Sequence, residues 1–303
     1  MDAISTALHN ILHYSFVDEA ASPNLYNVQE SLRWLLISAG IFIPLSYVCP
    51  GKPKQPKFRK DMLADGIYWF FGPFFYHRAS NFIIFYLLIS FYAVNTTWLN
   101  REQQSVIATW PVWVQCVIML LAADFLQYWV HRAFHKYPLW KFHAIHHSPP
   151  DVDWMTSVRF HPVNLLLYST LMNSFVYLLG FSPAAYDSLF VFNSIYSPLV
   201  HANLNWTYGP FKYVLASPVF HRWHHTYPEE GGDKNFAPTF PFLDVMFGTF
   251  YMPEGKQPET FGAPHDAIDT EDFLQQMLYP FLPAKKPKAE TRQDSLPTQE
   301  IKP

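Results

Sequence analysis

The chain has 303 residues, 50% of them hydrophobic, 18% aromatic and only 15% charged, whereas soluble domains carry about 25% charged residues. This deficit indicates a chain that faces a lipid bilayer. A net charge of −3 without an interleaved Lys/Arg run gives no reason to expect nucleic acid as a partner. The only two cysteines, Cys49 and Cys116, lie far apart in apolar surroundings, which excludes a disulfide framework and a Cys-ligated iron–sulfur cluster.

Five apolar segments are candidate membrane helices, and no stretch alternates apolar and polar residues with the period of a strand. Several are shorter than the ~20 residues that a perpendicular span needs, so their ends must include the aromatic flanks. We therefore expect an all-α, multi-pass membrane protein with about five transmembrane helices. The segments are residues 34–48, 82–94, 112–129, 165–181 and 184–200.

The loop after the first candidate span is basic, whereas residues 1–30 are acidic. Positively charged residues in short loops remain in the cytoplasm. Five spans then predict an external N-terminus, a cytoplasmic C-terminus and a cytoplasmic location for residues 131–159. Residues 66–76, which are aromatic and contain Gly72-Pro73, are interpreted as an interfacial or re-entrant element. The basic residues of the loop are Lys52, Lys54, Lys57, Arg59 and Lys60.

Three regions follow from this pattern. Residues 1–110 form an N-terminal membrane region with two spans and the interfacial segment, and residues 111–260 form a helical domain that contains most of the histidines. Residues 285–303 are rich in Lys, Pro and Gln and have little apolar surface to bury, which predicts a disordered tail.

Eight of the 14 histidines lie in three short motifs, His131-Arg-Ala-Phe-His135, His143-Ala-Ile-His146-His147 and His221-Arg-Trp-His224-His225. Residues four apart lie on one helix face. His131 can therefore share a metal with His135, His143 with His147 or His146, and His221 with His225 or His224. The rings of adjacent residues diverge by ~100° around a helix. They can therefore bind two different metals, or one can bind a metal while the other contacts a ligand of that metal.

Eight imidazoles exceed the four ligands of one tetrahedral zinc, and two metals account for them. Imidazole binds zinc, iron, copper and nickel alike. The location of the motifs at a membrane face, without cysteine ligands, favours iron. Four further histidines are interpreted as ordinary surface or core residues: His9, His13, His77 and His265.

Asp124 lies on the same helical stripe as Tyr128, His131 and His135. A carboxylate inside a span is costly unless it is paired. We interpret Asp124 as the acceptor of a ring N–H from a metal-bound histidine. The alternative is a polar contact between helices without a role in chemistry.

The three motifs, with only seven residues between His135 and His143, resemble those of the fatty acid hydroxylase/sterol desaturase superfamily. The approach to the first motif, Asp124-Phe-Leu-Gln-Tyr-Trp-Val-His131-Arg132, is also similar. The resemblance covers roughly residues 120–250, and it implies that residues 111–260 are the catalytic domain. It implies a di-iron, O2-dependent enzyme with its site on the cytosolic membrane face, which hydroxylates or desaturates a sterol, acyl or alkyl lipid.

The resemblance also implies an additional ligand between the second and third motifs, and the matching residue is His201. Some relatives have a second histidine four residues on, where this chain has Asn205. Asn205 binds through its carbonyl or a water, or the position stays open. His161, in Arg159-Phe-His161-Pro-Val-Asn164, is a further possible residue of the metal site. It has three open interpretations: a contact to a metal-bound residue, a contact to the substrate, or a structural residue.

The chain has no glycine fingerprint for a flavin or dinucleotide, and His161-Pro-Val is not the His-Pro-Gly-Gly of a fused haem domain. We therefore expect a separate redox protein as electron donor, beside the lipid and O2. Two rivals remain. A di-zinc lipid hydrolase is disfavoured because such enzymes usually bridge their metals with carboxylates. A metal transporter needs histidines at several depths in the spans, whereas these cluster outside them.

Overall fold

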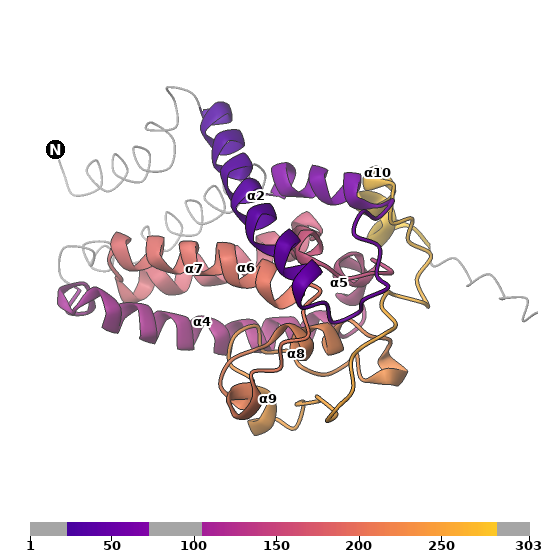
Figure 1. Cartoon of the computed structure of the whole chain (residues 1–303). Helices are drawn as coiled ribbons and strands as arrows, with labels where there is room; N and C mark the ends of the chain where they lie inside the picture. The colour runs from indigo at the N-terminus through magenta and orange to yellow at the C-terminus, as the bar shows by residue number, and fades with distance from the viewer. Residues whose placement is uncertain (1–22, 73–104, 284–303) are drawn as a thin grey trace, which may run out of the picture.

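The computed structural model describes residues 23–72 and 105–283 of the chain (Figure 1). These residues form helices, 3-10 turns and loops, and their only β-type pairing is an isolated bridge between Pro50 and Leu204. Within this part of the chain the all-helical prediction is confirmed. The predicted span 82–94 and the predicted tail 285–303 lie outside the described residues.

Two described helices contain segments long and apolar enough to cross a membrane, Val28–Val48 of α2 (Pro23–Val48) and Val112–Phe134, which is α4. At 1.5 Å per residue, 21 residues extend for about 31 Å, which matches a hydrocarbon core of about 30 Å. Both segments are mostly unburied within the protein, as expected of helices whose apolar side chains face lipid.

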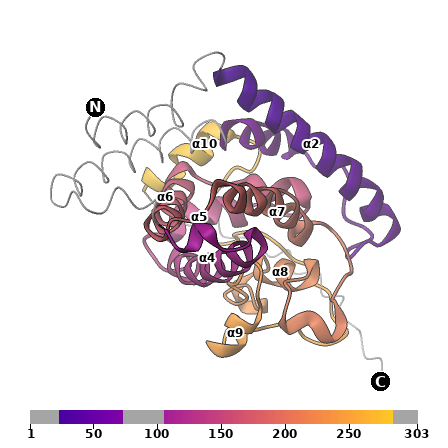
Figure 2. The same ribbon diagram turned by 90° about the vertical axis from the view of Figure 1, so that its left-hand side faces the viewer.

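The fourth and fifth predicted spans are both helical, as α6 (Pro162–Leu179) and α7 (Pro183–His201). They form a hairpin through Gly180, whose positive φ of 68° suits glycine. Ser182 begins α7 by accepting a hydrogen bond from the Ala185 N–H. Helix α4 packs on both α6 and α7, so the three run side by side (Figure 1). Helix α2 lies outside this bundle (Figure 2) and packs on α7.

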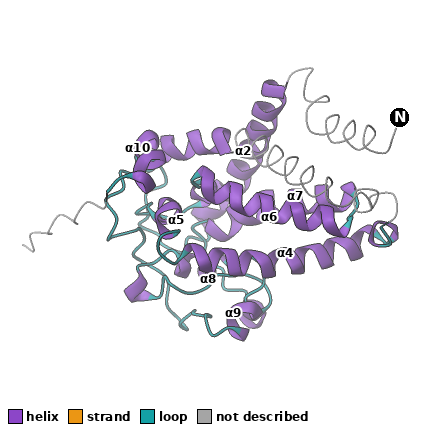
Figure 3. Ribbon diagram, turned by 180° about the vertical axis from the view of Figure 1, so that it is seen from behind, coloured by secondary structure: helices purple, strands orange, loops and turns teal. Residues whose placement is uncertain are grey.

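The remaining elements are short, and all except η3, which precedes α4 at the opposite end, gather with most of the loops at one end of the bundle (Figure 3). The α-helices are α5 (Trp140–His147), α8 (Pro218–His224), α9 (Phe242–Met246) and α10 (Phe273–Leu278). The 3-10 turns are η3 (Ile107–Thr109), η4 (Trp154–Val158), η5 (Gly209–Tyr213), η6 (Pro228–Glu230) and η7 (Tyr279–Phe281).

The predicted interfacial segment, residues 66–76, is helical over its described part, residues 66–72, within a helix that begins at residue 62. Tyr68 is buried, donates a hydrogen bond to Gln276 and packs edge-on against Phe273, both in α10. Trp69 donates to the carbonyl of Ser31 in α2. One face of this helix is therefore fixed between α2 and α10. The rest of the predicted segment, residues 73–76, lies outside the described residues.

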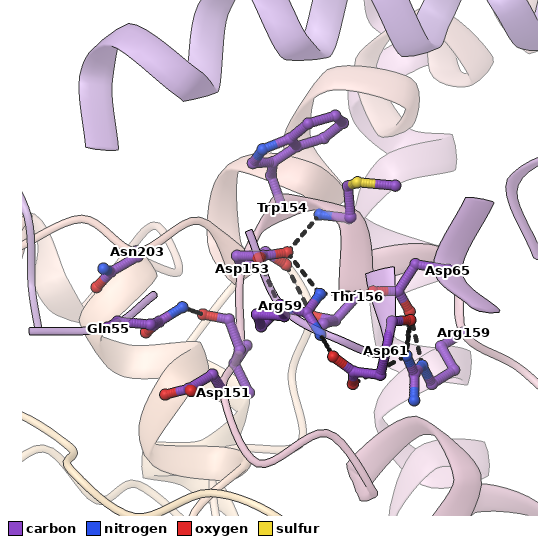
Figure 4. A network of polar contacts seen from close by, with 12 residues as sticks. Gln55, Arg59, Asp61, Asp65, Asp151, Asp153, Trp154, Thr156, Arg159 and Asn203 are labelled. Atoms are coloured by element: carbon purple, nitrogen blue, oxygen red, sulfur yellow. Dashed lines mark hydrogen bonds and ion pairs between the residues drawn. The ribbon is translucent and has the colours of Figure 1, made fainter. Parts of the chain in front are cut away.

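The basic loop after α2 is docked on the protein through buried ion pairs (Figure 4). The Arg59 guanidinium lies 2.5 Å from Asp61, 2.5 Å from Asp65 and 2.8 Å from Asp153. Arg159 joins the same cluster, 2.6 Å from Asp65. Burial disfavours a charged Arg59, but these carboxylates outweigh it and raise the pKa of the guanidinium above its usual value. The predicted N-terminal region thus contacts the predicted catalytic region through charges without access to water.

Candidate metal centre

Nine histidines converge in two neighbouring groups. In each group one nitrogen per residue lies within 4.8 Å of all the others, a spacing that can hold a metal ion. The five-histidine group is His131, His135, His143, His147 and His224, and the four-histidine group is His146, His201, His221 and His225. These nine residues are the predicted set of histidine ligands, brought together from α4, α5, α7 and α8.

Helix geometry decides which histidine joins which group. His143 and His147 are one turn apart on α5 and stay together, whereas His146 turns to the other group. The third motif behaves likewise, because His221 and His225 share one group and His224 joins the other. The sequence left both pairings open. The structure selects the i, i+4 pairs and divides adjacent rings between two sites.

Five of the nine rings place Nδ1 against an oxygen that can only accept a hydrogen bond. Each of these Nδ1 atoms must therefore carry the proton and donate it, which leaves Nε2 as a bare lone pair. This tautomer binds a metal through Nε2, with the ring fixed by the bond on its other side. The pairs are His131 with Phe236 O (2.8 Å), His143 with Asn164 Oδ1 (2.7 Å), His146 with Arg159 O (3.2 Å), His201 with Ser197 O (2.7 Å) and His224 with Lys234 O (2.7 Å).

The bare nitrogens then face one another. His131 Nε2 lies 3.0 Å from His143 Nε2, and His146 Nε2 lies 3.3 Å from His201 Nε2. With every Nδ1 of these rings protonated, no proton is left to share between the two lone pairs, and they repel. A cation between them removes the repulsion, since ligands at about 2.1 Å from a metal are ~3.0–3.4 Å apart when they subtend 90–109°. The donor set therefore fits a metal in each group.

Burial keeps these rings neutral. It lowers the pKa of seven histidines well below the ordinary value, and the charge that neighbouring imidazoles would carry, for His143 that of His131, lowers it further. Neutral imidazole is the form that binds a metal. The seven are His135, His143, His146, His147, His221, His224 and His225.

Among the described residues, Asp124 makes no hydrogen bond to a histidine, so its interpretation as the acceptor of a ring N–H is not supported. Its Oδ2 accepts a hydrogen bond from the backbone N–H of Phe240 (2.9 Å) and orders that loop. Asp124 precedes His131 by seven residues, about 10.5 Å along a helix, so sharing a stripe does not bring the two side chains together. Among the described residues, His131 instead has the Phe236 carbonyl as its Nδ1 partner.

His161 and Asn205 lie outside both groups. His161 precedes α6, where its Nδ1 accepts from the Val163 N–H (3.1 Å) and its Nε2 lies 3.1 Å from the Met277 carbonyl. These contacts support the structural interpretation of His161. The Asn205 side chain is exposed, whereas all of the four-histidine group is buried. The chain turns away after α7 ends, and the Asn205 N–H bonds to Cys49 O, so its prediction as a ligand is not supported.

The hydrogen-bond acceptors that hold the histidine rings in place were not predicted from the sequence. Asn164 accepts a hydrogen bond from His143, a role that the sequence did not predict. Its position in the first turn of α6, three residues after His161, was the available signal. The other partners, Phe236, Arg159, Ser197 and Lys234, use backbone carbonyls, which leave no signature in residue type.

Residues 116–249 match the family model named fatty acid hydroxylase, and this stretch contains all nine histidines of the two groups. Ornithine lipid hydroxylase OlsE of Rhizobium tropici is 30% identical over 187 residues, which cover 59% of this chain and 56% of that protein. Alkylglycerol monooxygenase of Xenopus tropicalis is 30% identical over 171 residues, covering 56% of this chain and 36% of that protein.

Delta(7)-sterol 5(6)-desaturase ERG3A of Gibberella zeae is 31% identical over 146 residues, covering 48% of this chain and 40% of that protein. The chain therefore spans between about a third and somewhat more than half of the length of these relatives. No solved structure matches the chain.

Proposed function

The chain belongs to the fatty acid hydroxylase/sterol desaturase family, and we propose that it is a membrane-bound oxygenase with two iron ions, one in each histidine group. Its reaction is the O2-dependent hydroxylation or desaturation of a lipid at a C–H bond. One observation carries this proposal above the rest: within each of two adjacent histidine groups, bare Nε2 lone pairs face one another.

The irons, when bound, supply the oxygen chemistry that breaks a C–H bond. The chain supplies fixed ligands, because carbonyl and amide oxygens hold the rings in one tautomer and one orientation. Phe160 stacks on His146 with ring centroids 4.1 Å apart and planes 12° apart, which fixes that ring further. All of the four-histidine group and three of the five-histidine group are buried, so bulk water is kept from the ligands.

A lipid substrate is supported by the position of the site and by the relatives. His131 lies in the last turn of α4, a candidate membrane span, so a lipid can reach the histidines from the bilayer without crossing water. The relatives named above act on an ornithine lipid, an alkylglycerol and a sterol. We propose a substrate of this broad class, an acyl, alkyl or sterol lipid.

The proposed topology has five spans, which include α2, α4, α6, α7 and residues 82–94. The histidine groups and the C-terminus then lie on the cytoplasmic side of a plasma, inner or endoplasmic reticulum membrane. Electrons come from a separate redox protein. Reporter fusions at the two termini test this topology, and both ends on one side of the membrane would refute five spans.

Lipid profiling of cells with and without the gene, under labelled O2, tests the reaction itself. Hydroxylation adds one labelled oxygen to a lipid, and desaturation removes two hydrogens in an O2-dependent manner. His143→Ala should abolish the new product, whereas His265→Ala should not, because His265 is exposed and lies 3.0 Å from Glu229 at the surface. An unchanged lipid profile in cells whose protein holds two irons would contradict the proposal.

A further inference from the structure

One short segment, residues 233–236, contacts three rings of the five-histidine group. The carbonyl of Lys234 accepts from His224 (2.7 Å) and that of Phe236 accepts from His131 (2.8 Å). The Asp233 carboxylate lies 3.3 Å from Nδ1 of His135. Among the described residues, the ring partners of the four-histidine group lie elsewhere, at Arg159 and Ser197. The segment therefore faces one site and not the other.

Asn235 fixes the turn at the centre of this segment. It is fully buried and has a positive φ of 57°, a conformation that asparagine tolerates better than most residues. Its side-chain amide donates to Phe220 O (2.8 Å) and Tyr251 O (2.6 Å), and its Oδ1 accepts from Tyr251 N (2.6 Å). Its backbone N–H donates to Thr249 O (2.9 Å). The carbonyls on either side of Asn235 are thereby held toward two different rings.

Asp244, in α9, holds the end of the same segment. One carboxylate oxygen accepts from the Phe236 N–H (2.8 Å) and from the Thr249 hydroxyl (2.6 Å). The other accepts from the Ala237 N–H (2.9 Å). Asp244 is fully buried and touches none of the described histidine rings. Its contacts act on the metal site only through the backbone that it orders.

We propose that residues 233–236, fixed by Asn235 and Asp244, are the positioning element of the five-histidine group alone. Loosening this segment then empties one metal site and leaves the other filled. The inference rests on the proposed two-metal function. It adds to that function that the two metal sites are supported separately, because the rings of the four-histidine group bond to a different part of the chain, at Arg159 and Ser197.

The support of the four-histidine group provides the matched comparison. The carbonyl of Arg159 accepts from His146, and its guanidinium is bound by Asp65 (2.6 Å) and Asp61 (3.1 Å) in the buried ion network (Figure 4). Arg159→Lys keeps the carbonyl and the charge but loses the forked contacts. It should loosen the metal of the four-histidine group, and not that of the five-histidine group.

Metal content of the purified full chain after loading with iron tests the proposal. Asp244→Asn places an amide NH2 against a backbone N–H that now meets a carboxylate oxygen, so the segment should shift. We expect two irons per chain in the wild type and one in Asp244→Asn. Combining Asp244→Asn with His135→Ala should still leave one iron, because both changes act on one site. Combining it with His146→Ala should leave none.

Each other outcome for folded protein overturns the proposal. Two irons in Asp244→Asn would show that the segment does not position ligands, and no iron would show that both sites depend on it. Loss of the remaining iron in the double variant with His135→Ala would contradict action on one site. Fewer than two irons in the wild type would instead refute the proposed function, so the two failures are distinguishable.

Asp233→Ala keeps the test decisive if Asp244→Asn fails to fold, because the Asp233 side chain is 46% exposed. Loss of such a contact to a ligand typically lowers metal affinity about 10–100-fold. In Asp233→Ala, one of the two irons should therefore be removed by a chelator at a correspondingly lower chelator concentration than in the wild type. Glu254→Ala removes an exposed carboxylate elsewhere and should match the wild type. Equal retention of both irons by Asp233→Ala and Glu254→Ala would overturn the proposal.

Discussion

The two histidine groups are built from the same ligand type but are supported unequally. In the five-histidine group, His131, His143 and His224 each donate Nδ1–H to an oxygen. In the four-histidine group, Nδ1 of His221 and of His225 is buried without a hydrogen-bond partner among the described residues. The four-histidine group has one imidazole fewer, and two of its rings are not held by a hydrogen bond at Nδ1. We therefore predict that it binds its metal more weakly than the five-histidine group does. Ligand count alone therefore does not describe the site, because the atoms behind each ring also differ.

Removing one ligand should have the largest effect and tests whether there are two sites. Alanine at any of the nine histidines should abolish turnover and lower the metal content from two ions to one. His146→Ala should be as severe as His147→Ala, because these adjacent residues serve different groups. Elemental analysis and product formation measure both effects, with His265→Ala as the unaffected control. Normal metal content in His143→Ala or His225→Ala would show that the wrong residues had been identified.

Breaking the ion network should damage the support of the four-histidine group. Asp65→Ala leaves Arg59 and Arg159 buried with one carboxylate fewer, and breaking such a pair costs about 3–5 kcal/mol of stability. Thermal unfolding should show a clearly lower melting temperature and, at partial occupancy, preferential loss of metal from the four-histidine group. Arg33→Ala removes an ion pair with Glu30 at the surface, where the Arg33 side chain is 60% exposed. Such a pair contributes ~0–1 kcal/mol to stability, so this variant should change little. Equal decreases in melting temperature for Asp65→Ala and Arg33→Ala would contradict the claim that burial makes the ion network important for stability.

Removing a ring partner should have a smaller effect than removing a ring. Asn164→Ala deletes the acceptor of His143 Nδ1–H, and the expected loss is about 10–100-fold in metal affinity or activity. Asp124→Asn should cost less, since the amide oxygen can still accept from the Phe240 N–H and Asp124 touches no described histidine. Metal titration and kinetics on the two variants decide between them. A larger loss in Asp124→Asn would restore Asp124 as a partner of a ligand.

The pH dependence of the metal-free protein should be a gradual effect. Burial lowers the pKa of His143, His147 and His225, among others, in the folded protein, so below the unfolded value of about 6.5 the unfolded chain binds more protons. Stability is then complete above pH ~6.5 and falls as the pH decreases. The melting temperature of the metal-free protein should therefore decrease from pH 7 to pH 5. A flat profile would mean that the rings are not buried.

The convergence of the nine histidines was predictable because most of the information is local. Spacings of three and four residues fix which rings share a helix face, and His201 followed from the resemblance. The supports were not predictable, because Asn164 and Arg159 are brought to the rings by long-range folding, and most supports are backbone atoms. Arg59 was misleading for a related reason. As a residue type it indicated the cytoplasmic side of a span, but its charge is buried among Asp61, Asp65 and Asp153.

Anaerobic titration of the metal-free wild type with Fe(II) tests the central claim most directly, namely that two unequal histidine groups each hold one ion. We expect two equivalents to bind in two steps. The tighter step should disappear in His143→Ala and the weaker step in His225→Ala. Saturation at one equivalent in folded protein, or the loss of the same step in both variants, would contradict two separate sites.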